Sequence, residues 1–450
     1  MSRSALFLFG IAGVIAATGV ACSANPTTGS TSEGGSPSTT STNSGSTASG
    51  KGGADASSST GEDITIGVGT GGQPPIGDCD SKADEDKDLD GWSKNDGDCN
   101  DCDINVNPGA IEVKITTPQG DGGIPTPADE DCDGKIDNVA PTCDEALALT
   151  DVDPNDAVKA IDICQTTTDN PPDKHDRKWG ALSATYVGAD GVTPRTPGLQ
   201  VGLLDKFGMN VKTRLGKSML GLSSGIMRAQ GQAGTCSNIV SARSCDNKTH
   251  GPPPAGFPQA VPGCPVDTTI HDDIALEVKL RSPTNATGYK FNFKFYSYEF
   301  PEYICSKFND QFVALAMPAP MGSINGNISF DSGNHPVSVN IAFFDVCDPN
   351  SSSAFGQFSA NKPPIPNPYC PSGKSDLLGT YMDGTTNMYY AGATSWLQTS
   401  APVKGGDDVT IRFAIWDTGD NNLDSSVLVD AFEWIANGGT VKVGTVKPPA

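Results

Sequence analysis

Phe291-Asn292-Phe293-Lys294-Phe295 is the stretch of this 450-residue chain that decides its fold. Apolar and polar side chains alternate along it, and a period of two is typical of a β-strand with one buried face. The same alternation returns at residues 276–280, 337–343 and 409–415, and Gly, Pro, Asn or Asp residues bound these segments. Because no helical pattern separates the strands, we expect a mainly β fold over residues 143–437, an antiparallel β-sandwich of the jelly-roll kind.

A single helix is expected before these strands. Asp153 is followed by Pro154, which pairs an N-cap residue with proline at the first helical position. Apolar residues then recur at helical spacing as far as Cys164. At the other end of the predicted sandwich, residues 438–450 are expected to form a tail.

Residues 77–138 are predicted to form an acidic module with two Asp/Gly loops, at residues 86–92 and 129–137. Each loop has carboxylates at positions one, three and five, and Gly at position six. Alternate side chains then converge on one point, and the glycine permits the turn that brings the next backbone carbonyl in as a ligand. Calcium, which takes about six to eight oxygen ligands, fits this pattern better than magnesium.

Part of the usual calcium-loop pattern is missing. Position twelve of the first loop is Gly97, so Asp96 or Asp98 is expected to replace the usual Glu, and position twelve of the second loop is Ala140. Trp92 and Lys135 are expected to bind the metal through their backbone carbonyls. The predicted metal ligands of the module are Asp86, Asp88, Asp90, Trp92, Asp96, Asp98, Asp129, Asp131, Asp133, Lys135 and Asp137.

The charge distribution supports a metal in this module. The chain has a net charge of −23, and residues 78–138 hold 18 acidic and 5 basic residues, a net charge of −13. Carboxylates concentrated in this way repel one another unless counter-ions are bound. The alternative is a solvated, disordered acidic linker, but such a linker has no need of glycines at a fixed offset. A pI near 4.4 and the lack of a basic patch disfavour nucleic-acid binding.

The N-terminus has the features of a bacterial export signal. Arg3 precedes an apolar stretch that is too short to span a bilayer, and residues 19–22 read Gly-Val-Ala-Cys. This end resembles a lipobox, which implies lipidation of Cys22 and, because Ser23 follows, sorting to the outer membrane. Cleavage after Ala21 without a lipid is the alternative. Residues 23–76 are Ser, Thr, Gly and Pro-rich and are expected to be a disordered tether.

The chain contains 13 cysteines, so lipidation of Cys22 leaves twelve for six disulfides. An exported chain favours disulfides over zinc or redox chemistry for the Cys99-x-x-Cys102 pair. The connectivity stays open. The candidates are Cys79, Cys99, Cys102, Cys132, Cys143, Cys164, Cys236, Cys245, Cys264, Cys305, Cys347 and Cys370.

Two family resemblances rest on these residues. Through residues 96–101, 107–112 and 131–138, the acidic module resembles the MopE-type metal-binding motif of bacterial surface proteins. That resemblance raises copper as a ligand, but the module contains no His, and ligands that are all oxygen favour calcium. Through residues 296–303, 308–312 and 417–427, the large domain resembles the choice-of-anchor L domain. This second resemblance implies a surface module with varied anchors and no established catalytic activity.

Carboxylates at the strand ends suggest another metal site. Glu299, Asn309, Asp310, Asp417 and Asp424 follow predicted strands, and strand ends meet at one edge of a sandwich. We therefore expect the four carboxylates among them to converge in one calcium coordination sphere. The alternative is turn chemistry, for which Asn and Asp are commonly used.

No catalytic residues are predicted. Gly221-Leu222-Ser223-Ser224-Gly225 matches a nucleophile elbow, but that elbow needs a parallel α/β sheet. Glu299 and Glu302 are too close in sequence to define a glycosidase pair. The sequence thus predicts a lipid-anchored, calcium-binding protein of the outer membrane or cell surface, which adheres to a glycan or another surface protein. The alternatives are a secreted hydrolase acting on polysaccharide or ester, and a structural envelope protein.

Overall fold

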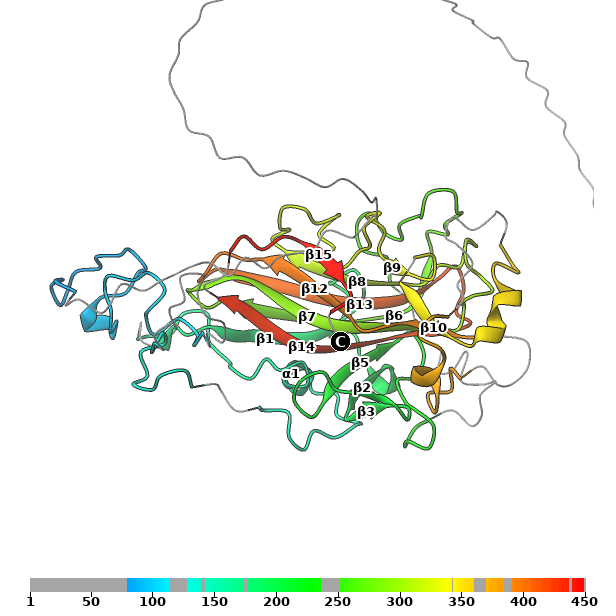
Figure 1. Cartoon of the computed structure of the whole chain (residues 1–450), viewed down its shortest axis with the longest axis horizontal. Helices are drawn as coiled ribbons and strands as arrows, with labels where there is room; N and C mark the ends of the chain where they lie inside the picture. The colour runs from blue at the N-terminus through cyan, green and yellow to red at the C-terminus, as the bar shows by residue number, and fades with distance from the viewer. Residues whose placement is uncertain are drawn as a thin grey trace, which may run out of the picture. The chain divides into compact units, whose positions relative to one another are not determined.

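The computed structural model of the chain describes residues 79–113, 128–138, 142–173, 176–235, 251–341, 343–359, 370–383, 390–436 and 439–448. Two antiparallel sheets face each other in this part of the chain, so the predicted mainly β sandwich is confirmed (Figure 1). Within the described ranges, no helix is both long enough and apolar enough to cross a membrane.

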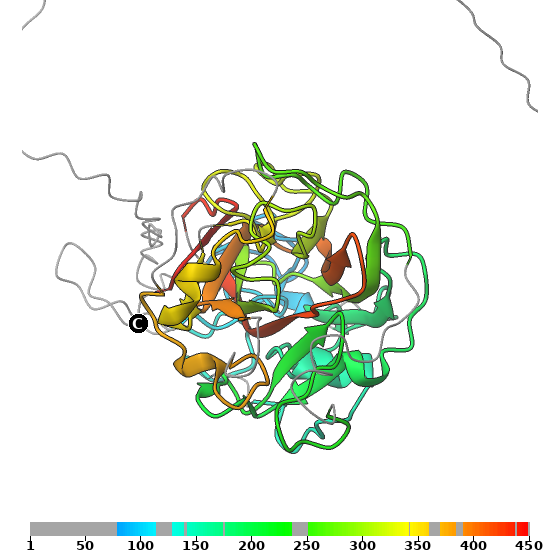
Figure 2. The same cartoon turned by 90° about the vertical axis from the view of Figure 1, so that its right-hand side faces the viewer.

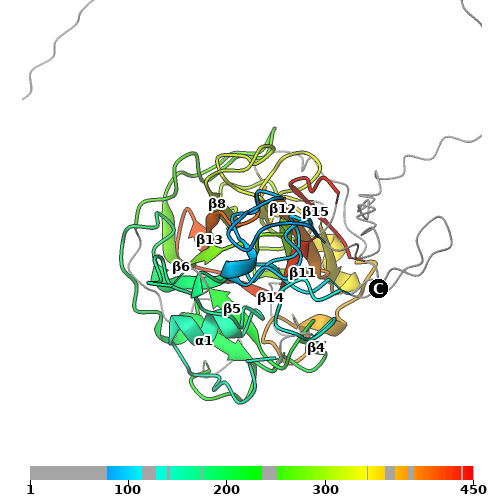
Figure 3. The same ribbon diagram turned by 90° about the vertical axis from the view of Figure 1, so that its left-hand side faces the viewer.

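The first sheet has five strands in the order β1-β6-β13-β8-β9, and each neighbouring pair is antiparallel. In its centre, Phe413 of β13 lies opposite Leu276 of β6 and Ala314 of β8. Figure 3 shows β6, β13 and β8 together on one side of the sandwich. The strands are β1 (Gly180–Val187), β6 (Ile270–Arg281), β8 (Gln311–Met317), β9 (Val337–Ser338) and β13 (Asp408–Thr418).

The second sheet has eight strands and is centred on β7, which pairs with β11, β12 and β14. Its main order is β10-β11-β7-β14-β5-β2, and β15 extends it by pairing with β12. Its strands are β2 (Val201–Leu204), β5 (Met219–Ser223), β7 (Ala286–Ser297), β10 (Phe344–Cys347), β11 (Gly392–Thr394), β12 (Leu397–Pro402), β14 (Ser425–Ala436) and β15 (Gly444–Val446).

Short elements complete the fold. A two-stranded hairpin is formed by β3 (Lys206–Phe207) and β4 (Val211–Lys212). The short helices are η1 (Lys94–Asp96), α1 (Pro154–Lys159), η3 (Gly198–Gln200), η4 (Pro349–Ala354) and η5 (Ser375–Leu377). Figure 2 looks onto the end of the sandwich at which η4 and η5 lie.

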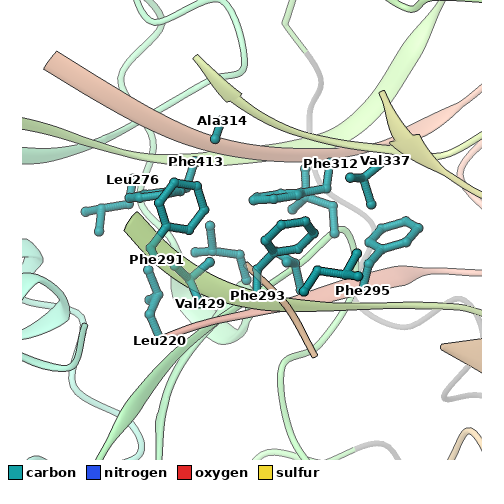
Figure 4. Close-up of a cluster of buried hydrophobic side chains, with 14 of the residues drawn as sticks. Leu220, Leu276, Phe291, Phe293, Phe295, Phe312, Ala314, Val337, Phe413 and Val429 are labelled. Atoms are coloured by element: carbon teal, nitrogen blue, oxygen red, sulfur yellow. The ribbon is translucent and has the colours of Figure 1, made fainter. Parts of the chain in front are cut away.

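The core lies between the two sheets, where β7 contributes three phenylalanines that are fully buried (Figure 4). The ring of Phe291 meets Phe413 edge-on with 5.0 Å between centroids, and Phe293 lies 5.1 Å from Phe312. Edge-on aromatic pairs add to the stabilisation that comes from burial alone. The alternation that predicted the strand therefore points to the sheet interface.

The polar side of β7 differs from the prediction of a solvated face. Asn292 is 5% exposed and Lys294 is 0% exposed. Lys294 remains satisfied because its Nζ donates to the Thr394 carbonyl at 2.6 Å and pairs with Asp376 at 2.9 Å. A second apolar cluster, which includes Tyr296 and Leu428, covers this outer face and excludes water from it. From Phe291 to Ser297, β7 is thus buried on both faces.

The helix and the third predicted strand are shorter than expected. Asp153 caps α1 by accepting from the Asn155 backbone N–H, as predicted, but the helix ends at Lys159. Of the described residues 337–341 and 343, only Val337 and Ser338 form a strand. The chain turns after them because Asn340 N donates to Asn309 Oδ1 instead of extending the sheet ladder.

Disulfides are confirmed for ten of the twelve predicted cysteines. The bonds are Cys79–Cys102, Cys99–Cys132, Cys143–Cys164, Cys264–Cys305 and Cys347–Cys370. Cys99 and Cys102 have different partners, so they form no redox pair with each other. Cys236 and Cys245 lie outside the described residues, as do Cys22, the export signal and the tether.

Candidate metal centres

Hydrogen bonds within the first acidic loop hold its carboxylates in place. Asp86 Oδ2 accepts from Gly91 N at 3.0 Å, and Asp90 Oδ1 accepts from Trp92 N at 2.7 Å. Gly91 has a φ of +97°, a conformation that L side chains rarely adopt. The glycine at position six therefore permits the turn that gathers the loop's carboxylates.

The first centre is a cluster of five aspartates. One oxygen from each of Asp86, Asp88 and Asp90 lies within 4.8 Å of the others, and the same holds for Asp88, Asp98 and Asp101. Oxygens bound to one calcium ion are separated by at most about 5 Å, so both triplets have suitable spacing. Asp101 was not predicted. Asp101 lies in residues 96–101, which match the MopE-type motif, and that match could have identified it as a ligand.

Four oxygens of this cluster are buried and accept no hydrogen bond among the described residues. They are Asp86 Oδ1, Asp88 Oδ2, Asp98 Oδ2 and Asp101 Oδ2. Asp98 and Asp101 are themselves buried, and the second oxygen of Asp101 accepts from Lys87 N at 2.8 Å. A buried carboxylate oxygen without a partner is costly, which makes a cation a suitable occupant.

The electrostatics of the first centre agree with this geometry. Burial raises the pKa of Asp90 to about 7, and the neighbouring Asp88 raises it further. Burial likewise raises the pKa of Asp98 to about 6 and that of Asp88 above its usual range. Neighbouring carboxylates thus raise these pKa values in addition to burial, and a bound divalent ion would lower them.

The second centre brings residues from two parts of the module together. One carboxylate oxygen from each of Glu112, Asp129 and Asp131 lies within 4.8 Å of the other two. Glu112 forms a second triplet of this kind with Glu130 and Asp137. Burial raises the pKa of Glu112 to about 7. Glu112 and Glu130 were not predicted as ligands. Glu112 lies in the residue 107–112 match to the MopE-type motif, which could have identified it, whereas no sequence signal identified Glu130.

Two predicted ligands lie outside these clusters. Asp133 is exposed, pairs with Lys135 Nζ at 2.9 Å and accepts from Asn138 Nδ2 at 2.8 Å, and its hydrogen bond to Lys135 lowers its pKa. Asp96 Oδ2 accepts from Ser93 Oγ at 2.8 Å. Of the two residues offered for position twelve, Asp98 is therefore the one that joins the cluster. The carbonyls of Trp92 and Lys135 stay predicted ligands.

The strand-end carboxylates meet around Asp310, which is fully buried. Its Oδ1 accepts from Thr418 N at 2.9 Å and its Oδ2 accepts from Ser425 Oγ at 2.6 Å. Its backbone N donates to Glu299 Oε2 at 3.5 Å. Burial raises the pKa of Asp417 well above its usual range, and the neighbouring Asp310 and Asp424 raise it further. These residues thus occupy one end of the sandwich.

They do not form the single coordination sphere that we expected. Among the described residues, no three of Glu299, Asp310, Asp417 and Asp424 bring one oxygen each within 4.8 Å of one another. The reason is that both oxygens of Asp310 are engaged by Thr418 and Ser425, which close the connection from β13 to β14. Asn309 likewise accepts a backbone hydrogen bond from Asn340. For Asp310 and Asn309, these contacts are turn chemistry.

The residues considered for hydrolysis are buried. Ser223 Oγ donates to the Ser425 carbonyl at 3.1 Å, and the cavity beside it has a volume of about 10 Å³, which is room for about one water molecule. Glu302 is fully buried, and its Oε1 accepts from Tyr390 N at 2.6 Å. Among the described residues, both side chains are thus enclosed by hydrogen-bond partners and neighbouring residues.

Comparison with protein families identifies a choice-of-anchor L domain over residues 207–433. No curated protein and no solved structure matches the chain. The matched range covers half of the chain and contains β4 to β13, whereas β1, β2 and α1 precede it. The family is not an enzyme family, and its domain indicates a secreted or surface-anchored protein. The chain therefore belongs to the choice-of-anchor L family and is a surface-associated protein with a β-rich fold.

Proposed function

We propose that residues 79–138 bind two calcium ions and that the module so formed works with the sandwich as an adhesion surface. The observation that carries the calcium proposal is the set of four buried carboxylate oxygens without partners in the first centre. Each belongs to a triplet with suitable spacing for one cation. A calcium ion would supply the missing partner and neutralise the carboxylates that now repel one another.

The donor set supports calcium over a transition metal. Both described clusters consist of carboxylates, and hard oxygen ligands suit calcium or magnesium. The neighbouring Cys79, Cys99, Cys102 and Cys132 are disulfide-bonded and offer no thiolate. Acidic triplets that draw on separate loop segments suit the tolerant geometry of calcium better than the strict octahedron of magnesium.

Calorimetric titration of the chain lacking residues 1–22 tests the calcium proposal. We expect two calcium ions per chain, weaker binding of magnesium, and loss of one ion in each of Asp88→Asn and Asp131→Asn. Asp84→Asn is the matched control, because Asp84 is exposed, lies in the same segment and belongs to neither cluster. Calcium at a hundredfold excess over Kd should add about 2.7 kcal/mol of stability per site. Absence of binding at millimolar calcium would refute the proposal.

We further propose that Cys22 carries the membrane anchor. The Gly-Val-Ala-Cys sequence at residues 19–22 and the odd total of 13 cysteines support it. Mass spectrometry of the protein from its native membrane should find an acylated Cys22, and Cys22→Ser should release the chain into the soluble fraction. An unmodified Cys22, or cleavage that leaves no lipid, would contradict lipid anchoring while leaving the calcium proposal intact.

A further inference from the structure

Two cavities meet at Trp179, where the acidic module contacts the sandwich. The first has a volume of about 420 Å³ and lies between the first calcium loop and the chain around Thr284 and Gly405. The second has a volume of about 520 Å³ and lies between the second centre and Trp434. Trp179 lines both cavities. A single indole therefore lines two spaces, each large enough for one or two sugar rings.

The polar group of Trp179 is already occupied. Its indole Nε1–H donates to the Ala110 carbonyl at 3.1 Å, which fixes the ring to the acidic module. The remaining surface of this half-buried ring is carbon, so it offers apolar contact and no hydrogen bond. Trp434, in the second cavity, is fixed as well, because it meets Phe432 edge-on at 5.1 Å and Tyr289 edge-on at 6.1 Å. Rigid, apolar indoles suit the C–H face of a sugar ring.

Cations surround Trp179, although the protein as a whole is strongly acidic. Arg177 and Lys404 line the first cavity, and Lys178 lines the second. All three side chains are exposed, and none has a carboxylate partner within ion-pair distance among the described residues. Three available cations beside an indole are suited to carboxylate groups, with which guanidinium and ammonium form charge-assisted hydrogen bonds.

We propose that the two cavities form one binding site for a short acidic glycan, a chain of sugars bearing carboxylates that lies across Trp179. Arg177, Lys178 and Lys404 would bind the carboxylates, and the indoles would pack against the sugar rings. The site rests on the proposed calcium binding in one respect. Asp90 lines the first cavity, and Glu112, Asp131 and Asp133 line the second. Lys135 pairs with Asp133, and calcium at the two centres would remove the repulsion that the other three carboxylates exert on an anionic ligand.

The test measures binding of tetragalacturonate to the chain lacking residues 1–22, at fixed calcium, by calorimetry and tryptophan fluorescence. Fully methyl-esterified tetragalacturonate is the matched neutral probe, and tetraglutamate is the matched non-sugar anion. We expect tetragalacturonate to bind at least about tenfold more tightly than either, because the ester lacks the charges that the three cations bind and tetraglutamate lacks the sugar rings that the indoles contact. Equal affinity for tetraglutamate, or no binding of tetragalacturonate, would overturn the proposal.

Variants locate the site. Trp179→Ala should weaken tetragalacturonate binding by about tenfold or more, and Arg177→Gln with Lys404→Gln should do the same. Trp396→Ala is the control for a half-buried tryptophan outside both cavities, and Lys206→Gln with Lys212→Gln is the control for loss of two exposed charges. Thermal melts report whether each variant is folded. If the controls weaken binding as much as the site variants, the assignment is wrong.

Calcium titration of the same variants separates this inference from the proposed function. Trp179→Ala should bind calcium with wild-type stoichiometry, because its side chain belongs to neither cluster. Calcium binding without tetragalacturonate binding would refute the glycan site and leave the calcium module standing. Tetragalacturonate binding that depends on Trp179 in a chain that binds no calcium would support the glycan site and refute the calcium module.

Discussion

The side-chain amide of Asn107 donates a hydrogen bond to the Asp90 carboxylate, with 2.7 Å between Nδ2 and Oδ2. The other end of the same amide faces the sandwich, because Asn107 Oδ1 accepts from Thr284 Oγ1 at 2.7 Å. Asn107 is fully buried. One side chain therefore joins a predicted calcium ligand to the connection between β6 and β7, and Gly109 strengthens this contact by accepting from Thr284 N at 3.0 Å.

Asn107→Ala should weaken calcium binding at the first centre. Removal of a hydrogen bond to a charged group costs about 1.5–3 kcal/mol, so we expect a Kd about tenfold higher or more. Hydrogen exchange of residues 107–113 should also become faster, because one of their contacts with the sandwich, the hydrogen bond from Thr284 Oγ1, is lost. Asn105→Ala is the control, since the Asn105 side chain donates to Asp103, which belongs to neither cluster among the described residues. Unchanged affinity in Asn107→Ala would contradict the link.

A buried carboxyl pair makes stability depend on pH. Asp162 and Asp430 share a hydrogen bond, and burial raises their pKa values to about 6 and about 8. Both values lie above the ordinary pKa of aspartate, about 3.9, so the folded chain holds protons that the unfolded chain releases. The stability that the pair contributes is fully present below about pH 4 and is lost as pH rises through about 6 to 8.

Asp162→Asn should flatten this dependence. An amide at position 162 supplies a permanent donor to Asp430, and Asn tolerates the φ of 70° that Asp162 adopts. The free energy of unfolding should fall between pH 5 and pH 8.5 at constant calcium. We expect this fall to be about 1–2 kcal/mol smaller in Asp162→Asn than in the wild type. Denaturant titrations at both pH values measure this difference. The exposed-site variant Asp176→Asn should follow the wild type, and a profile of Asp162→Asn parallel to both would exclude the pair as the cause.

Two lysines of β7 should respond very differently to substitution. Lys294 is fully buried and paired with Asp376, whereas Lys290 makes a partly exposed pair with Glu433 at 3.0 Å. Lys294→Ala leaves a cavity and removes the buried partner of both Asp376 and the Thr394 carbonyl, so we expect a loss of about 3 kcal/mol or more. Lys290→Ala should cost about 1 kcal/mol or less. Equal losses in denaturant unfolding would show that the outer face of β7 is open to water.

The disulfides of the acidic module should support both calcium centres. Cys99–Cys132 joins the residue after Asp98 to the residue after Asp131. The double variant Cys99→Ser with Cys132→Ser should therefore weaken calcium binding at both centres. Peptide mapping without reduction should recover Cys99–Cys132 and Cys79–Cys102, and recovery of a Cys99–Cys102 bond would contradict the structure. The double variant Cys143→Ser with Cys164→Ser is the control, because that disulfide lies outside the module.

The strand-end prediction shows where sequence reasoning fails. It placed Glu299, Asp310 and Asp417 near one another, and the structure does bring them to one end of the sandwich. It could not tell that Thr418 and Ser425 would occupy both oxygens of Asp310. Whether a carboxylate is available to a cation depends on its hydrogen-bond partners, which come from other strands.

What the sequence determined by itself was local. Phe291, Phe293 and Phe295 mark β7 because alternation with a period of two is a property of the strand alone, and Asp153-Pro154 marks the start of α1 for the same kind of reason. The fixed offsets of Asp86, Asp88 and Asp90 likewise predict convergence, because one short loop holds all three.

Tertiary structure alone decided the rest. It brought Glu130 into the second cluster, buried Lys294 beneath a second apolar layer, and made Trp179 part of the lining of two cavities. In each case the deciding quantity is a distance between residues far apart in the chain, or the water excluded by a neighbouring layer. Neither quantity is encoded in the spacing of nearby residues, because both depend on how the sheets and the acidic module pack.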